Sequence, residues 1–178
     1  DSSTSRGLGD VYKRQGLRPV EQILSPSEVD NLALNIEKAG GKISYRSTEG
    51  NERPYELNIA LFDALKFHVK DNDDGYQEER FIAAHSIMLA LEGIPAFYIN
   101  SLLCTENDYQ KLKHSGQNRA INRHQWPLDM LVRKLSENTH HSRVYKELLR
   151  LIKLRKAQPA FHPNATQFTL NLGNDVLA

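Results

Sequence analysis

The residues best suited to chemistry lie in the polar segment NRAINRHQW, where Arg119, Arg123, His124 and Trp126 fall close together. A guanidinium group is a permanent cation whose planar donors match a carboxylate or phosphate, so these arginines suit an anionic ligand. They could instead cap helix carbonyls or pair with surface carboxylates. The formal net charge of +1 argues against nucleic acid as a partner, because such partners require a basic surface.

Other reactive side chains give weaker signals. His140 and His141 begin a predicted helix, but no cysteine or carboxylate stands at metal-ligand spacing from them, so we expect no metal and no cofactor. The acidic run from Asp71 to Asp74 lacks the spacing of a calcium loop and predicts a solvated loop. Cys104 is the single cysteine and has no activating partner in the sequence. It cannot form an internal disulfide, which favours a cytoplasmic protein.

The elements that must position these residues follow an α/β pattern. Ser25-Pro26-Ser27-Glu28 is a capping box, and it predicts a helix that ends near Ala39. A second helix is predicted over 78–92, with His85 as a core histidine on its apolar face. The apolar run 94–99 after it has the composition of a parallel strand buried on both faces. Residues 101–126 then follow the carboxyl end of that strand, where α/β folds place ligand sites.

The rest of the sequence indicates a larger α/β domain. Residues 42–54 are polar and predict a loop excursion, 55–59 predict a short strand, and amphipathic helices are predicted over 127–137 and 142–157. One buried parallel strand cannot form a sheet alone, because its edges need partners. We therefore interpret the chain as part of a larger α/β unit.

Bulk composition limits the class of protein. The chain has 178 residues, of which 39% are hydrophobic and 25% are charged, which is typical of a globular protein. No apolar stretch reaches the roughly 20 residues that a membrane span needs, so we expect no membrane partner. The first fifteen residues lack an apolar core and do not form a signal peptide.

Six motifs occur in an order that resembles the sugar phosphorylases of glycoside hydrolase family 13, in the α-amylase clan. They are GLRPVE, GGKISYRS, PYELNIALFDAL, RFIAAHSIMLALEGIPAFYINSLL, NRAINRH and RLIKLRKAQPAFHPN. The closest likeness is to the sucrose phosphorylase-like branch, which includes enzymes that act on sucrose phosphate and on glucosylglycerate. The resemblance runs from about Gly16 to Leu172.

The resemblance implies an α/β fold: the C-terminal part of a TIM (β/α)₈ barrel, followed by the start of a C-terminal β domain. Residues 16–160 would belong to the barrel, with GIPAFYIN as its eighth strand, and residues 161–178 would begin the β domain. Family members carry His-Asp-Gly-Ile before the match to Gly16, but Tyr12 and Lys13 stand where the histidine and aspartate would be. Because SRGLGDVYKRQ resembles a translated sequencing adapter, we expect residues 1–15 to be non-native.

The activity implied by the resemblance is a retaining double displacement that uses two carboxylates about 5 Å apart and transfers a glucosyl unit to phosphate. The nucleophile and the acid/base would lie upstream, so no catalytic residue is assigned and this chain is expected to be inactive. The implied substrate-binding residues are Arg18, Tyr55, Glu56 and Arg119, with a small-molecule sugar and inorganic phosphate as partners. Glu56 stands where sucrose phosphorylases proper have glutamine, and such a carboxylate would repel phosphate unless paired.

Two other functions remain open at this point. One keeps the α-amylase clan but uses water or a sugar as acceptor, which gives a hydrolase or a transglucosylase. The other is a short protein that binds a sugar or a partner without catalysis, and it predicts cooperative unfolding of the isolated chain. The sequence does not indicate an oligomeric state.

Overall fold

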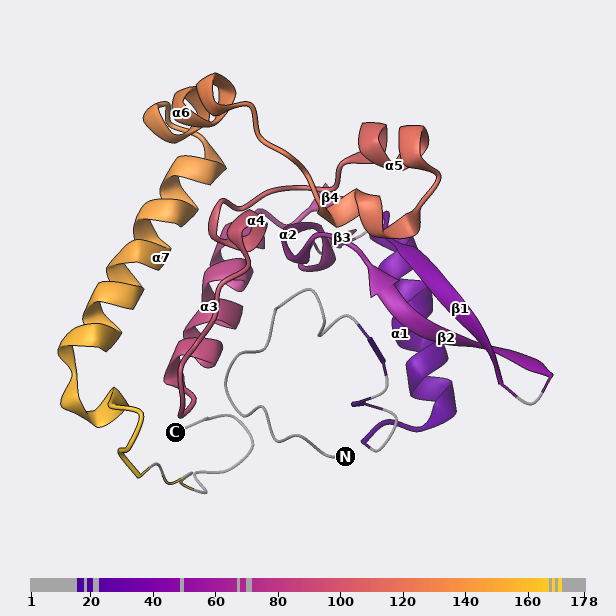
Figure 1. The fold of residues 1–178 in the computed structure, drawn as a ribbon, viewed down its shortest axis with the longest axis horizontal. Helices are drawn as coiled ribbons and strands as arrows, with labels where there is room; N and C mark the ends of the chain where they lie inside the picture. Colours follow the sequence, from indigo (N-terminus) through magenta and orange to yellow (C-terminus); the bar gives the residue numbers. More distant parts are fainter. Residues whose placement is uncertain are drawn as a thin grey trace.

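A computed structural model describes residues 16–17, 19–20, 23–48, 50–66, 68–69, 72–166, 168 and 170 (Figure 1). Residues 1–15 and Arg18 lie outside the described residues, as does most of the predicted β-domain start over 161–178. The N-terminal half contains α1 (Pro26–Lys38), β1 (Lys42–Thr48), β2 (Asn51–Asn58), α2 (Leu61–Ala64), β3 (His68–Val69) and β4 (Asn72–Asp73). The C-terminal half contains α3 (Gln77–Ala90), α4 (Ile99–Leu102), α5 (Tyr109–Ser115), η2 (Asn118–Asn122), α6 (Leu128–Ser136), α7 (His140–Ala157) and η3 (Pro159–Phe161).

Helix α1 begins and ends where the sequence predicts. The Ser25 side chain accepts a hydrogen bond from the Glu28 backbone, and the Glu28 carboxylate accepts one from the Ser25 backbone at 2.7 Å. Gly40, at φ 88°, follows the helix in the left-handed region that favours glycine. Ala33 and Ile36 on the buried face of α1 pack against Ile43 and Ile59, which gives the first apolar cluster.

The prediction of a polar loop over 42–54 is wrong, because this segment forms an antiparallel hairpin of β1 and β2. The apolar alternation that marks a strand is missing from 42–54 because most of the described residues between 45 and 53 are exposed. The strand predicted over 55–59 overlaps the second half of β2. Glu56 and Asn58 on β2 are both buried, and Asn58 Nδ2 donates to Ser44 Oγ on β1 at 2.9 Å. Hydrogen bonds inside the hairpin therefore replace part of the apolar contact that the prediction required.

The second apolar cluster lies between α3 and α7. Phe81, Val144 and Leu148 are fully buried there together with Cys104, and Phe62 from α2 packs edge-on to Phe81 with ring centroids 5.5 Å apart. His85 is buried on α3, and its Nδ1 donates to the Phe81 carbonyl at 2.8 Å, which confirms it as a core histidine.

The prediction of a buried parallel strand over 94–99 is also wrong for the described residues. The chain leaves α3 without a β-ladder partner and enters α4 at Ile99, and both Ile94 and Ile99 are exposed. A strand requires hydrogen bonds to a neighbouring strand, and both described sheets are short antiparallel pairs. Apolar composition alone does not supply that neighbour.

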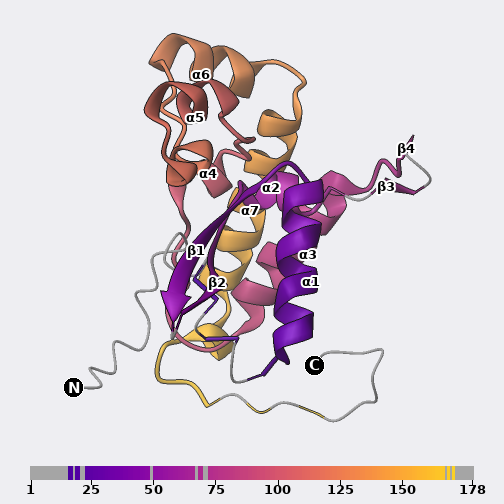
Figure 2. The same cartoon turned by 90° about the vertical axis from the view of Figure 1, so that its right-hand side faces the viewer.

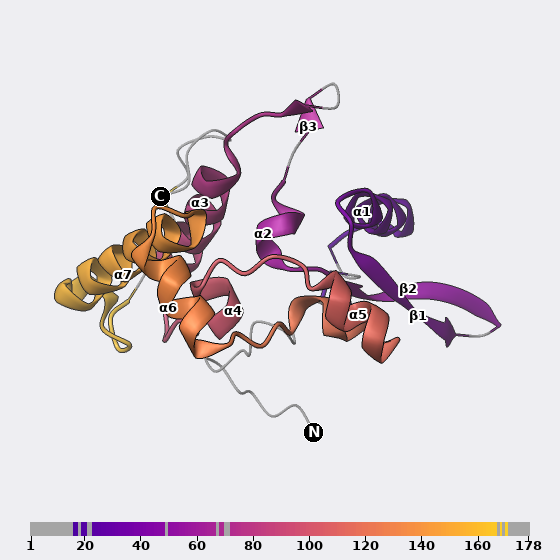
Figure 3. The same cartoon turned by 90° about the horizontal axis from the view of Figure 1, so that it is seen from above.

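The two clusters sit in separate parts of the molecule. Seen from above in Figure 3, α3, α6 and α7 form one group and α1 with the hairpin forms the other, with α2 and α4 between them. The turned view in Figure 2 shows α1 running beside the hairpin. The segment from Thr105 to Trp126 contacts both groups. Asn107 Oδ1 accepts from the Ala60 backbone at 2.7 Å and Asn118 Nδ2 donates to the Ile43 carbonyl at 3.1 Å, while the Trp126 ring packs against His141 on α7 with centroids 5.1 Å apart. Within the described ranges, no helix is both long and apolar enough to cross a membrane.

Candidate functional site

Glu56 and Arg119 form an ion pair at the junction of the hairpin and η2. Arg119 Nε donates to Glu56 Oε2 at 2.8 Å. The Glu56 side chain is only 10% exposed, whereas the Arg119 side chain is 51% exposed. The carboxylate is therefore fixed and largely covered, while the cation that pairs with it reaches the surface.

The fold brings these two residues together from elements that are far apart in sequence. Glu56 lies on the inward face of β2, two residues before the fully buried Asn58. Arg119 lies on η2, and the hydrogen bonds that hold that segment include one from Asn118 to the Ile43 carbonyl and one from the Asp108 backbone to the Ile121 carbonyl at 2.6 Å. Both partners of the ion pair are thus attached to anchored backbone.

Tyr55 forms a β-bulge next to Glu56 in the hairpin. Ser44 pairs with Glu56 and Tyr45 pairs with Pro54, so Tyr55 is the extra residue on β2. Its side chain is 38% exposed, and the Arg46 guanidinium lies 5.5 Å from its ring centroid. The structure therefore joins Glu56 directly to Arg119 but places Tyr55 against Arg46. Arg18, the fourth predicted site residue, lies outside the described residues.

The loop that follows η2 is also fixed by hydrogen bonds. His124 Nδ1 lies 2.6 Å from Asp108 Oδ2, and Asn100 Nδ2 donates to the His124 carbonyl at 3.0 Å. Burial opposes ionisation of Asp108, but hydrogen bonds from the Lys111 backbone and from His124 outweigh it, so the pKa of Asp108 is lowered. The charged Asp108 therefore helps to hold the segment that carries Arg119.

Among the described residues of this site, Arg119 offers a cation to an anionic ligand, and Glu56 and Arg119 do not form an acid/base pair for bond cleavage. A carboxylate that contacts an arginine has its charge compensated, so an incoming anion meets less repulsion than it would from an isolated carboxylate. An unpaired carboxylate at Glu56 would repel phosphate. Arg119 supplies the positive charge that pairs with it.

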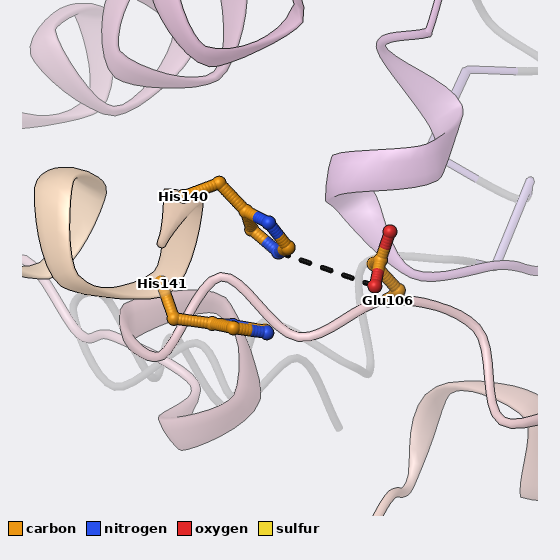
Figure 4. A group of neighbouring side chains, drawn as sticks. All are labelled: Glu106, His140 and His141. Carbon is orange, nitrogen blue, oxygen red and sulfur yellow. Dashed lines mark ion pairs between the residues drawn. The ribbon is translucent and has the colours of Figure 1, made fainter. Parts of the chain in front are cut away.

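A second group, formed by Glu106, His140 and His141, was not predicted from sequence patterns (Figure 4). One potential ligand atom from each residue lies within 4.8 Å of the others. The histidines begin α7, whereas Glu106 comes from the loop before α5, so local spacing in the sequence could not reveal the carboxylate. No carboxylate stands at metal-ligand spacing from the histidine pair in the sequence, but the fold brings Glu106 to them from another segment.

Cys104 is a structural cysteine. It is fully buried, has a φ of 52°, and its thiol pKa is raised by burial and by nearby carboxylates. A raised pKa reduces the fraction of thiolate, the form that nucleophilic chemistry needs, so burial and protonation both disfavour reactivity at Cys104.

Curated proteins with similar sequences are phosphorylases. The chain is 37% identical over 161 residues to glucosylglycerate phosphorylase of Escherichia coli (strain K12), which covers 89% of this chain and 28% of that protein. It is 35% identical over 153 residues to glucosylglycerate phosphorylase of Allomeiothermus silvanus, covering 85% of this chain and 28% of that protein. Sucrose phosphorylase of Agrobacterium vitis is 28% identical over 184 residues, covering 100% of this chain and 34% of that protein. The chain therefore spans about 28% of the length of the first curated relatives it matches.

A solved structure has the same fold over most of the chain. The crystal structure of sucrose 6F-phosphate phosphorylase from Thermoanaerobacter thermosaccharolyticum matches with a TM-score of 0.64 and 23% identity, covering 80% of this chain and 27% of that one. At this identity the match supports the fold and not the substrate. No protein-family model matches the chain.

Proposed function

Because this chain belongs to the sucrose phosphorylase-like sugar phosphorylases of glycoside hydrolase family 13, we propose that the complete protein is a retaining α-glucoside phosphorylase. It transfers a glucosyl unit from a glucosylglycerate-like or sucrose-like donor to inorganic phosphate and gives α-glucose 1-phosphate. The bond from the anomeric carbon to the donor oxygen breaks, the leaving group takes up a proton, and a bond to a phosphate oxygen forms. The 178-residue chain by itself is inactive in this proposal.

The observation that carries the proposal is the agreement among the first three curated relatives. They are 32–37% identical to this chain over 85–92% of it, and all three bear the name glucosylglycerate phosphorylase. This agreement favours a glucosylglycerate-like donor over sucrose.

The Glu56–Arg119 ion pair gives this donor class a physical basis. Glycerate and phosphate are both anions, so the acceptor side of the site must place a cation where each can reach it. The Arg119 side chain is half exposed, and its contact with Glu56 offsets the charge of that carboxylate. Tyr55 and Arg18 are proposed to complete the acceptor side, with Tyr55 held on the β-bulge beside Glu56.

Family membership also supports our assignment of residues 16–160 to the barrel and 161–178 to the start of the β domain, with a sugar and phosphate as small-molecule partners. We assign residues 1–15 to a non-native segment because SRGLGDVYKRQ resembles a translated sequencing adapter. The protein acts in the cytoplasm in this proposal, as its single cysteine favours.

The test is made on the full-length protein from the source genome, numbered as here. Phosphate-dependent formation of glucose 1-phosphate is measured with glucosylglycerate, sucrose and sucrose 6F-phosphate as donors, alongside glucose release by hydrolysis. We expect phosphorolysis of glucosylglycerate to be fastest. With sucrose, whose leaving group is uncharged, Arg119→Ala should lower phosphorolysis at least about tenfold while hydrolysis changes little, since the substitution removes a charge-assisted contact with phosphate.

Arg123→Ala is the matched control, because Arg123 is an arginine that follows η2, and the proposal assigns the contact with Glu56 to Arg119 alone. Equal losses of phosphorolysis and hydrolysis in Arg119→Ala, or an equal effect of Arg123→Ala, would contradict the role of Arg119. Glucose release without any dependence on phosphate would instead support a hydrolase. Glucose 1-phosphate formed by the 178-residue chain alone would overturn its proposed inactivity.

A further inference from the structure

We propose that Glu106, His140 and His141 form a binding site for a zinc-class divalent cation at the start of α7. This site is independent of the proposed phosphorylase activity. Two imidazoles and one carboxylate supply the nitrogen and oxygen ligands that Zn²⁺ accepts, and three protein ligands leave a fourth position for water.

The position of His140 gives the first argument. Its Nε2 atom is buried and has no hydrogen-bond partner among the described residues. The Glu106 carboxylate lies near this atom, with its Oε2 4.0 Å from His140 Nε2. That distance is too long for a hydrogen bond but is close to the roughly 3.4 Å that separates two ligands of one tetrahedral zinc ion.

His141 is oriented as a ligand would be. Its Nδ1 lies 2.9 Å from the Leu103 carbonyl, and because a carbonyl can only accept, Nδ1 must carry the proton. The lone pair is then on Nε2, which is the arrangement found for metal-bound histidines whose other nitrogen donates to a backbone carbonyl. The Trp126 ring packs edge-on against His141 with centroids 5.1 Å apart and helps to fix its plane.

The rest of the cluster is already ordered around this point. The Phe62 ring stacks on His140 with centroids 5.0 Å apart and an interplanar angle of 8°. The two imidazoles of His140 and His141 lie 3.9 Å apart between centroids. These ring contacts hold both histidines in place beside Glu106 before any cation binds.

A path for the cation exists from solvent. Glu106 and His141 line a surface pocket together with Thr105, Asp108, His124 and Trp126, among others. The Glu106 side chain is 57% exposed, so its carboxylate can rotate toward the histidines without disturbing the core. Its backbone is held on both sides, since the Thr105 amide donates to the Asn100 carbonyl at 2.8 Å and the Asn107 amide donates to Asp63 Oδ2 at 2.7 Å.

The test uses the full 178-residue chain, without an affinity tag and after dialysis against a chelator. Zn²⁺ is titrated by calorimetry, and Co²⁺ is added to a second sample to record the visible bands of a tetrahedral site. We expect one equivalent of Zn²⁺ to bind, tetrahedral Co²⁺ bands to appear, and the thermal midpoint to rise with Zn²⁺. Glu106→Gln and His140→Ala should each weaken binding at least about tenfold and abolish the tetrahedral bands.

His114→Ala is the matched control, because His114 is an exposed histidine on α5 whose Nδ1 contacts the Gln110 carbonyl. The His114→Ala variant should bind Zn²⁺ as tightly as the wild type does. Glu106→Gln changes only an exposed side chain and keeps the test valid if His140→Ala does not fold. Unchanged binding in Glu106→Gln, equal losses in His114→Ala, or no stoichiometric binding to the folded wild type would overturn the proposal.

Discussion

The α3–α7 region and the hairpin region are stabilised in different ways. Between α3 and α7, large side chains such as Phe81 and Leu148 are completely buried in apolar contact. The cluster beside the hairpin consists of Ala33, Ile36, Ile43 and Ile59, and the inward face of β2 adds the polar Glu56 and Asn58. The first region therefore depends mainly on apolar burial, and the second depends more on specific hydrogen bonds and one ion pair.

This difference explains where the candidate site lies. In a region held by apolar packing, the helices turn their apolar side chains inward. In a region held by polar contacts, the same polar groups can also bind a ligand. Glu56 and Arg119 belong to the second kind of region, and the same contact that stabilises the hairpin junction presents the cation.

The largest expected effect comes from comparing one core residue of each region. Phe81→Ala should lower the free energy of unfolding by about 3–5 kcal/mol, because it leaves a cavity between α3 and α7. Ile43→Ala should lower the free energy of unfolding by only about 2 kcal/mol, since isoleucine is smaller than phenylalanine and Ile43 lies in a two-stranded hairpin. Urea unfolding of both variants measures the difference. Phe81→Leu, which keeps most of the volume, is the control, and a larger loss in Ile43→Ala than in Phe81→Ala would reverse the comparison.

A backbone feature inside the α3–α7 region gives the next effect. Cys104 has a φ of 52°, where a β-branched side chain is strained, so Cys104→Val should destabilise the protein by about 2 kcal/mol. Cys104→Gly should change stability by less than about 1 kcal/mol, because relief of the backbone strain offsets the loss of buried side chain. Equal thermal midpoints for the valine and glycine variants would show that backbone conformation has no influence at this position.

The contact between the two regions should have a smaller effect. Asn107→Ala removes the acceptor of the Ala60 backbone amide, which is buried, and should cost about 1–2 kcal/mol. Ser115→Ala is the matched control, because it removes an exposed side-chain acceptor of the Gln117 backbone amide at 3.2 Å and should cost less than about 0.5 kcal/mol. Urea unfolding measures both losses. Equal losses in the two variants would mean that burial of the Ala60 amide adds nothing to this contact.

Sequence patterns predicted the helical parts of the fold well and the strands poorly. The capping box at Ser25 and the periodicity of α3 depend on neighbours within a few residues, so both were predicted correctly. The first part of the hairpin was missed because most of the described residues between 45 and 53 are exposed and follow no apolar alternation, whereas the strand predicted over 55–59 overlaps the end of β2. The strand over 94–99 was predicted from apolar composition, although a strand is defined by partners elsewhere in the chain.

The site residues show the same limit. Family resemblance selected Glu56 and Arg119 separately, but only the folded chain shows that they are 2.8 Å apart. Glu106 could not be linked to the histidine pair, because no local spacing connects them. Contacts between residues distant in sequence were the part that neither periodicity nor motif could supply.

The smallest expected effect is a pH dependence at the entry to α3, where Arg80 binds the Asp74 carboxylate through two hydrogen bonds of 2.6 and 2.9 Å. The side-chain hydrogen bonds from Arg80 lower the pKa of Asp74 in the folded protein. A lowered folded-state pKa gives stability that is present above the unfolded-state pKa, near 4, and is lost as the pH falls through the folded-state value. Wild type should therefore be more stable than Asp74→Asn at pH 7 and pH 5, and the difference should shrink below about pH 4.

Urea midpoints of wild type and Asp74→Asn at several pH values measure this difference. In an Arg80→Gln background the carboxylate has lost its partner, so the Asp74→Asn substitution should have a much weaker pH dependence there. A stability difference that stays constant from pH 7 to below the folded-state pKa would contradict the ion pair as its source. A difference that shrinks equally with and without Arg80 would assign the effect to the Tyr76 amide, which also donates to Asp74 at 3.1 Å. The α3–α7 region would then depend on local backbone capping at its entry, and apolar packing would remain its main source of stability.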